Sequence, residues 1–147
     1  MVPNVRIIAD QTLDQLEGVE WGPPMHDSSL VTNVHRLRRV PLKQYRLEDL
    51  RLMIGQQVGV HYLVPLALDH LEAYPLASGD FYPGDVLDAV VRLPDGFWST
   101  HRQLVTRAIR AIDAALVRIH NVDTVEEVPD ELRAARVRLA GLDDGRA

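Results

Sequence analysis

Apolar residues recur at intervals of three and four along most of the chain, which is the spacing of amphipathic helices. The longest such run covers residues 99–119, where the arginines mostly fall on the other face. Similar patterns predict helices over residues 28–40, 47–57, 66–74, 85–93 and 129–139. The chain is therefore expected to form an all-α, multi-helix bundle of about six helices.

Residues 55–85 are the stretch around which the rest is organised. Its apolar positions spread so widely around a helix axis that several neighbours must bury them, which predicts a central helix. Pro65 lies inside this pattern, so we expect a kink or a break just before it. Gly55 and Gly59 permit either the close approach of another helix or a bend. A compact acidic and aromatic turn, Asp80 to Asp85, follows.

The N-terminal region is less regular. Residues 5–9 form a short apolar run that fits one short N-terminal strand or a tail. Thr12 with Gln15 three positions later predicts a capped short helix that Gly18 ends. We expect a single domain over residues 1–147, with residues 1–11 and 141–147 flexible.

The composition limits the class of protein. Hydrophobic residues make up 46% and charged residues 25% of the sequence, as in ordinary globular proteins. Cysteine is absent, which excludes disulfides and thiolate metal sites and fits a reducing compartment. No signal sequence or long apolar span occurs, so we expect a cytoplasmic protein without a membrane partner.

The charge distribution suggests a partner. The net charge of −5 disfavours direct binding of nucleic acid. Residues 10–27 contain five acids and no lysine or arginine, and residues 69–95 contain six acids against Arg92 alone. A surface built from these segments would attract a basic partner. The alternative is that both are simply solvated faces.

No catalytic or cofactor motif stands out. The histidines lack the spacing of metal ligands, so we expect no metal and no cofactor. Asp80 and Asp85 could serve, with a histidine, as the acid and base of a small hydrolase. Both also have structural explanations, since Asp85 stands at a helix start and Asp80 in a turn. A helical scaffold without catalysis is a third possibility.

Several segments, taken in order, resemble a known family. They are LEGVEWGPP, HDSSLVTNVHRLRRVPL and LEDLRLMIGQQVGVHYLVPLALDHLEAYPLASGDFYPGDVL, within a resemblance that covers roughly residues 13–98. DFYPGD, at residues 80–85, is the most distinctive part. The series resembles the immunity proteins of contact-dependent growth inhibition (CDI) systems, and the helices after residue 100 match only in character.

The resemblance implies a small cytoplasmic antitoxin that is not an enzyme. It would bind and block a cognate toxin domain of a large secreted protein, most often a basic nuclease, with a ribonuclease A-like fold favoured. Aromatic residues beside carboxylates have the composition of an interface hot spot. The expected toxin-binding residues are Asp80, Phe81, Tyr82, Asp85, Asp88, Trp21 and Asp27.

Overall fold

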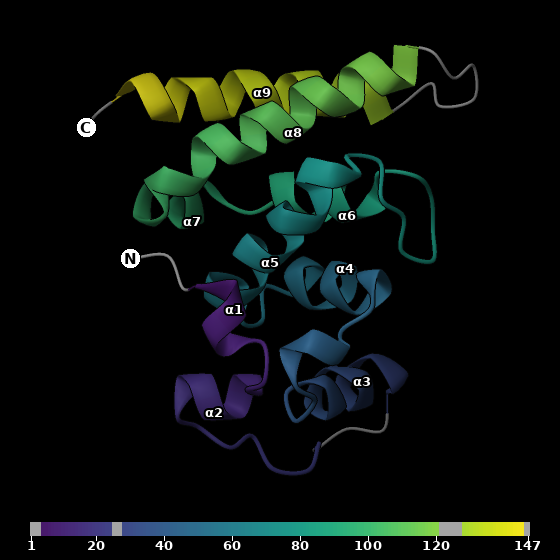
Figure 1. Cartoon of the computed structure of the whole chain (residues 1–147), viewed down its shortest axis with the longest axis vertical. Helices are drawn as coiled ribbons and strands as arrows, with labels where there is room; N and C mark the ends of the chain where they lie inside the picture. Colours follow the sequence, from purple (N-terminus) through teal and green to yellow (C-terminus); the bar gives the residue numbers. More distant parts are fainter. Residues whose placement is uncertain (1–3, 25–27, 121–127, 146–147) are drawn as a thin grey trace.

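The computed structural model describes residues 4–24, 28–120 and 128–145 (Figure 1). All regular elements in these ranges are helical, so the all-α prediction is confirmed. The elements are α1 (Val5–Ile8), α2 (Leu13–Glu17), α3 (Ser29–Leu37), the 3₁₀ turn η1 (Leu42–Gln44), α4 (Leu47–Gly55), α5 (Val60–Ala73), α6 (Asp85–Val91), α7 (Asp95–Thr100), α8 (Arg102–His120) and α9 (Val128–Gly145). The extent of the domain and the flexibility of its ends stay predictions.

The prediction of a short N-terminal strand is wrong, because residues 5–8 form the helix α1 instead. The side chain of Asn4 caps this helix by accepting a hydrogen bond of 3.0 Å from the backbone N–H of Arg6. The described ranges also contain no strand with which the segment could pair. The capping box of Thr12 and Gln15 is confirmed, with reciprocal bonds of 2.9 and 3.1 Å at the start of α2.

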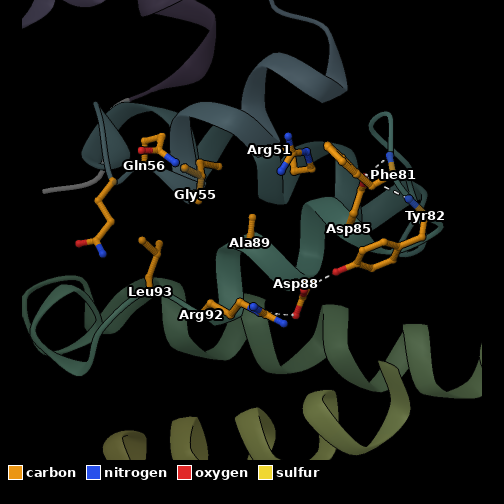
Figure 2. Close-up of a pocket in the computed structure, with 12 residues that line it drawn as sticks. Arg51, Gly55, Gln56, Phe81, Tyr82, Asp85, Asp88, Ala89, Arg92 and Leu93 are labelled. Carbon is orange, nitrogen blue, oxygen red and sulfur yellow. Dashed lines mark hydrogen bonds and ion pairs between the residues drawn. The ribbon is translucent and has the colours of Figure 1, made fainter. Parts of the chain in front are cut away.

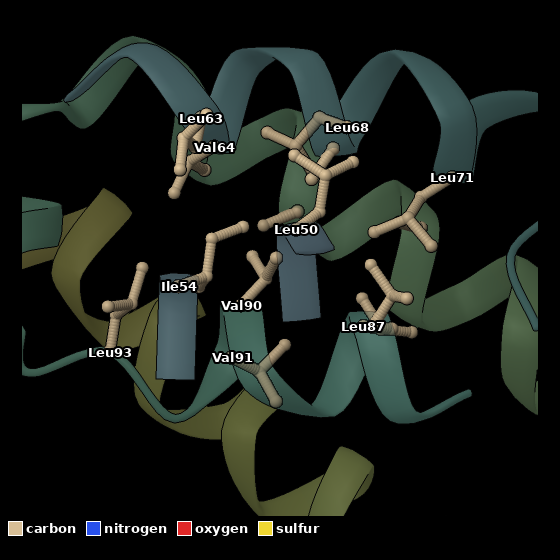
Figure 3. Close-up of a cluster of buried hydrophobic side chains, with 14 of the residues drawn as sticks. Leu50, Ile54, Leu63, Val64, Leu68, Leu71, Leu87, Val90, Val91 and Leu93 are labelled. Atoms are coloured by element: carbon tan, nitrogen blue, oxygen red, sulfur yellow. The ribbon is translucent and has the colours of Figure 1, made fainter. Parts of the chain in front are cut away.

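The core lies where α4, α5 and α6 meet. α5 contacts α1, α4, α6 and α8, so its prediction as the central helix is confirmed. Its apolar face meets those of α4 and α6 in one continuous buried cluster (Figure 3). α8 and α9 lie side by side and close the bundle on one side (Figure 1). Prominent members of the cluster are Leu50, Ile54, Leu63, Leu68, Leu87 and Val90.

The boundary between α4 and α5 differs from the prediction. α4 ends at Gly55, and α5 begins at Val60 after a turn in which Gly59 has a φ of 64°. A Cβ atom at Gly59 would lie only 2.6 Å from Cδ1 of Leu13, so the turn also lets α2 approach closely. Both roles allowed for this glycine pair therefore occur at Gly59, a turn of the chain and the close approach of another helix.

Pro65 does not break its helix. α5 runs without interruption from Val60 to Ala73, with Pro65 buried at its sixth position. The missing N–H removes only the hydrogen bond to the carbonyl of His61, and burial against α4 and α6 holds the helix together. Further along, the longest helix was predicted to begin at residue 99 but begins at Arg102, and residues 95–100 form the separate helix α7.

Candidate functional site

A carboxylate fixes the backbone of the loop between α5 and α6. We call residues 78–84 the presenting loop. Asp85, the first residue of α6, is only 3% exposed. Its Oδ1 accepts the backbone N–H of Gly79 at 2.6 Å, and its Oδ2 accepts those of Phe81 at 3.0 Å and Tyr82 at 3.4 Å. A helix-start aspartate thus stabilises the preceding turn through charge-assisted hydrogen bonds.

Glu48 completes this support from α4. Its Oε1 accepts the backbone N–H of Asp80 at 2.9 Å, so each amide from Gly79 to Tyr82 donates to a carboxylate. Both carboxylate oxygens of Glu48 also accept hydrogen bonds of 2.6 Å from Arg51. The hydrogen bond from Arg51 lowers the pKa of Glu48, which keeps the carboxylate charged. The loop is therefore tied to α4 as well as to α6.

The loop that Asp85 and Glu48 hold in place carries two aromatic side chains, Phe81 and Tyr82. The ring of Phe81 is 67% exposed, and the guanidinium of Arg51 lies over it at 4.2 Å from the ring centroid. The hydroxyl of Tyr82 donates a hydrogen bond to Oδ2 of Asp88, which is 5% exposed. Burial and that hydrogen bond raise the pKa of Tyr82 to about 12, so the hydroxyl stays protonated at neutral pH.

Arg92 closes the charge network around Tyr82. Its Nε donates to Oδ1 of Asp88 at 3.0 Å, and its Nη2 donates to Glu131 of α9 at 2.9 Å. These two hydrogen bonds raise the pKa of Arg92 above its already high ordinary value. The network links the loop to α6 and α9, so Tyr82 is held in place from two directions.

The two aromatic residues border a surface hollow of about 380 Å³ between α4 and α6 (Figure 2). Apolar side chains of Ile54, Ala89 and Leu93 contribute to its lining, and Arg51 and Arg92 lie on either side. Its other lining residues are Gly55, Gln56, Gln57, Phe81, Tyr82, Asp85 and Asp88. Such a concave surface beside exposed aromatic rings is suited to the binding of another protein.

The acid and base set considered for a hydrolase does not assemble here. Both oxygens of Asp85 accept backbone hydrogen bonds, whereas Asp80 enters the network through its backbone amide. The described residues that line the hollow include no histidine. An acid and base pair needs two open groups within reach of one substrate, and beside the exposed Asp80 neither Asp85 nor a histidine of this lining supplies the second.

The structure brings five of the seven expected site residues together. Asp80, Phe81 and Tyr82 are exposed on the presenting loop, whereas Asp85 and Asp88 are buried beneath it. The two buried acids hold the surface and contribute little of it. Trp21 belongs to a different region, between α2 and α3, and Asp27 lies outside the described residues.

Sequence reasoning missed Glu48 and Arg51 as parts of this site. Glu48 lies in the first turn of α4, where an acid is already explained by the helix dipole. Its bond to the amide of Asp80 spans 32 positions, which no local pattern indicates. The spacing of three between Glu48 and Arg51 does predict their ion pair.

The histidines form one notable contact away from the hollow. Nδ1 of His61 lies 2.8 Å from Nε2 of His101, and the ring of Phe97 stacks on His101 at 4.1 Å. Burial, followed by the neighbouring His101, lowers the pKa of His61, which favours its neutral form. Within the described ranges no three histidine or acidic side chains gather as metal ligands. The pair is thus a link between α5 and the α7–α8 junction.

A known protein family matches a long continuous part of this chain. The family described as CDI immunity proteins matches residues 15–108, nearly two thirds of the chain. The chain belongs to this family. The matched segment includes the presenting loop, Glu48, Arg51 and the whole hollow, and it ends inside α8. No curated protein and no solved structure matches the chain.

Membership of the immunity family confirms the resemblance found in the sequence. It indicates an antitoxin that protects against a CDI toxin, and it implies that the chain binds a cognate toxin partner. A family of this kind also suggests a non-enzymatic inhibitor. No helix in the described part of the chain has the length and apolar character needed to span a membrane.

Proposed function

We propose that this immunity protein acts in the cytoplasm of the producing cell, where it binds and blocks the nuclease domain of a large secreted toxin. A ribonuclease of ribonuclease A-like fold is the favoured toxin. Binding involves protein contacts, without nucleic acid, membrane or cofactor. The presenting loop carries the contact, through Asp80, Phe81 and Tyr82.

The observation that carries this proposal is an exposed aromatic residue on a loop that is already ordered. Phe81 is 67% exposed, yet the backbone on both sides of it is bound to Glu48 and Asp85. Ordering a loop on binding opposes association, so a loop held in advance binds more tightly. Large side chains on such a support, with Arg51 beside them, are typical of interface hot spots.

Charge supports a nuclease as the partner. Nucleases bind phosphate groups in basic grooves, and an acidic inhibitor is steered towards such a groove. The chain has a net charge of −5, and within the described ranges Asp80 forms no ion pair. Its carboxylate stands exposed on the loop beside Phe81, where it can meet a basic side chain of the toxin.

The test is co-expression with the C-terminal domain of the large secreted protein encoded beside this chain. We expect growth rescue, a complex that survives purification, and suppression of RNA degradation in the same extract. The Phe81→Ala variant should lose rescue, whereas Val137→Ala, an equally exposed apolar site on α9, should keep it.

Two results would count against the proposal at different levels. If the toxin kills without degrading RNA or DNA but is still neutralised by this chain, the proposal of a nuclease partner is wrong and the immunity function stands. If the wild-type complex forms and Phe81→Ala still gives full rescue, the presenting loop is not part of the interface.

A further inference from the structure

A second hollow adjoins the base of the presenting loop. It has a volume of about 340 Å³ and is formed where the start of α4, the end of α5 and the end of α8 come together. Its lining is mainly apolar, with two basic side chains among it. The lining residues are Leu47, His70, Tyr74, Leu76, Ala77 and Arg118.

This hollow and the presenting loop share their supports. The backbone N–H of Gly84 donates to the carbonyl of Leu76 at 3.1 Å, which closes the base of the loop against the wall of the hollow. On the α4 side, Leu47 immediately precedes Glu48, the residue that holds the amide of Asp80. The two surfaces are therefore neighbours, and a partner that binds the loop lies close to the hollow.

Exposed aromatic residues extend across both surfaces. Tyr74 is 68% exposed at the end of α5 and lines the second hollow. Together with Phe81 and Tyr82 it places three large exposed side chains within residues 74–82. Single exposed apolar residues are ordinary, but a group of them beside a hollow marks an interaction surface.

The charge of the second hollow is opposite to that of the loop. Arg118 forms no ion pair within the described residues, whereas Arg107 on the same helix binds both Asp69 and Glu72 at 2.7 Å. An arginine at the edge of an apolar hollow, with no ion pair in the described part of the chain, is suited to a carboxylate, which can accept two parallel hydrogen bonds from it.

We propose that the second hollow is another part of the toxin interface, an inference that rests on the proposed function. It receives an apolar side chain of the toxin that stands next to a carboxylate, and this carboxylate pairs with Arg118. Asp80 on the loop attracts a basic group of the toxin, so the two contacts have opposite polarity. Such an arrangement fixes the orientation of the partner, because a reversed toxin would meet like charges at both ends.

Titration of the purified full-length chain against the same toxin domain tests this assignment. We expect Tyr74→Ala to raise Kd about tenfold and Arg118→Glu to raise it at least about fivefold. Tyr74→Phe should bind within about twofold of wild type, because the ring remains. The charge-matched control is Arg110→Glu, also exposed on α8 but absent from the hollow, which should leave Kd unchanged within the same limit.

The side chains of Tyr74 and Arg118 are both exposed, so we expect every variant to keep its fold. Thermal melting of each variant checks this. If Tyr74→Ala and Arg118→Glu both bind with wild-type affinity while Phe81→Ala loses binding, the second hollow is not part of the interface. The proposed function would still stand. Failure of the wild-type chain to bind the toxin would instead overturn the proposed function. A dimer of the free chain that Tyr74→Ala dissociates would show that a second copy occupies the hollow, and would equally overturn the inference.

Discussion

Two loops of this protein have similar compositions and opposite constructions. The presenting loop and the loop of residues 18–24 each expose an aromatic residue next to acids. At the presenting loop the carboxylates of Asp85 and Glu48 bind backbone amides, and Phe81 stays 67% exposed although Arg51 lies over one part of its ring. In the other loop the aromatic residue, Trp21, lies on a buried ion cluster.

That cluster is centred on Arg38, which is 1% exposed. Its Nε donates to Oδ1 of Asp14 at 2.7 Å, and its Nη1 donates to Glu17. The ring of Trp21 lies 4.3 Å from the guanidinium carbon and shields it from water. His35 contacts the edge of the same ring, with 5.2 Å between the centroids.

The difference shows that an aromatic residue beside acids does not by itself indicate an interface. What matters is the group that the carboxylates bind. Where they bind the backbone, they order a surface for a partner. Where they bind a buried arginine, the aromatic ring becomes its cover. Trp21, expected from the sequence to contact the toxin, is therefore predicted to act in folding.

The largest effect should follow from removing the main support of the presenting loop. Asp85→Ala leaves three amides without their acceptor at a buried position, so we expect a loss of roughly 3 kcal/mol in the free energy of unfolding. Urea denaturation measures it. Asp80→Ala is the control, since its exposed side chain should contribute within about 0.5 kcal/mol. A fully stable Asp85→Ala variant would contradict this account of the loop.

Phe81→Ala should separate binding from stability. We expect Kd for the toxin to rise about thirtyfold, roughly 2 kcal/mol, because a central aromatic contact is lost. The free energy of unfolding should change by no more than about 0.5 kcal/mol, since the ring is mostly exposed. Calorimetric titration and urea denaturation of the same preparation give both values. A variant that unfolds readily but binds normally would reverse the comparison.

Trp21→Ala should show the opposite pattern. Loss of the ring opens the cluster around Arg38 to water and removes its cation–π contact, so we expect about 1.5 kcal/mol less stability. Toxin affinity should stay within about twofold once the variant is folded. Trp21→Phe keeps a ring over Arg38 and should recover part of the stability. Strongly weakened binding by a stable Trp21→Ala variant would restore this residue to the interface.

The smallest effect concerns the hydroxyl of Tyr82. Tyr82→Phe removes the hydrogen bond to Asp88 and should cost about 1 kcal/mol near neutral pH. A raised pKa means that the folded state holds the proton more tightly. This contribution is therefore present below the ordinary tyrosine pKa of about 10 and is lost as the pH rises to about 12. Stability curves of the two proteins should converge over that interval, and parallel curves would contradict the assignment.

Local patterns accounted for the helices better than for the site. The apolar spacing of α8 and the capping box of α2 follow from neighbours in sequence, and both were predicted. α7 was missed, although Pro94 followed by an acid is a common helix start. The uninterrupted α5 could not be foreseen at Pro65, because burial against other helices outweighs one missing hydrogen bond.

The placement of the acids depended on distant residues. Asp85 was predicted at a helix start, where it lies, but its bonds to the preceding loop require a backbone path that the sequence does not specify. The pairing of Arg38 with Asp14 spans 24 positions. Composition therefore located the acidic segments correctly and could not tell a surface carboxylate from a buried one.

The support of the presenting loop also separates positions that must stay from those that can vary. A Cβ atom at Gly79 would lie 2.5 Å from Oε1 of Glu48, and the amide of Gly79 donates to Asp85, so Gly79, Glu48 and Asp85 form a fixed frame. At positions 80 and 81 only the backbone amides enter the frame, and the side chains are exposed. A library randomised at these two positions should therefore fold as one protein and yield antitoxins that discriminate between different toxins.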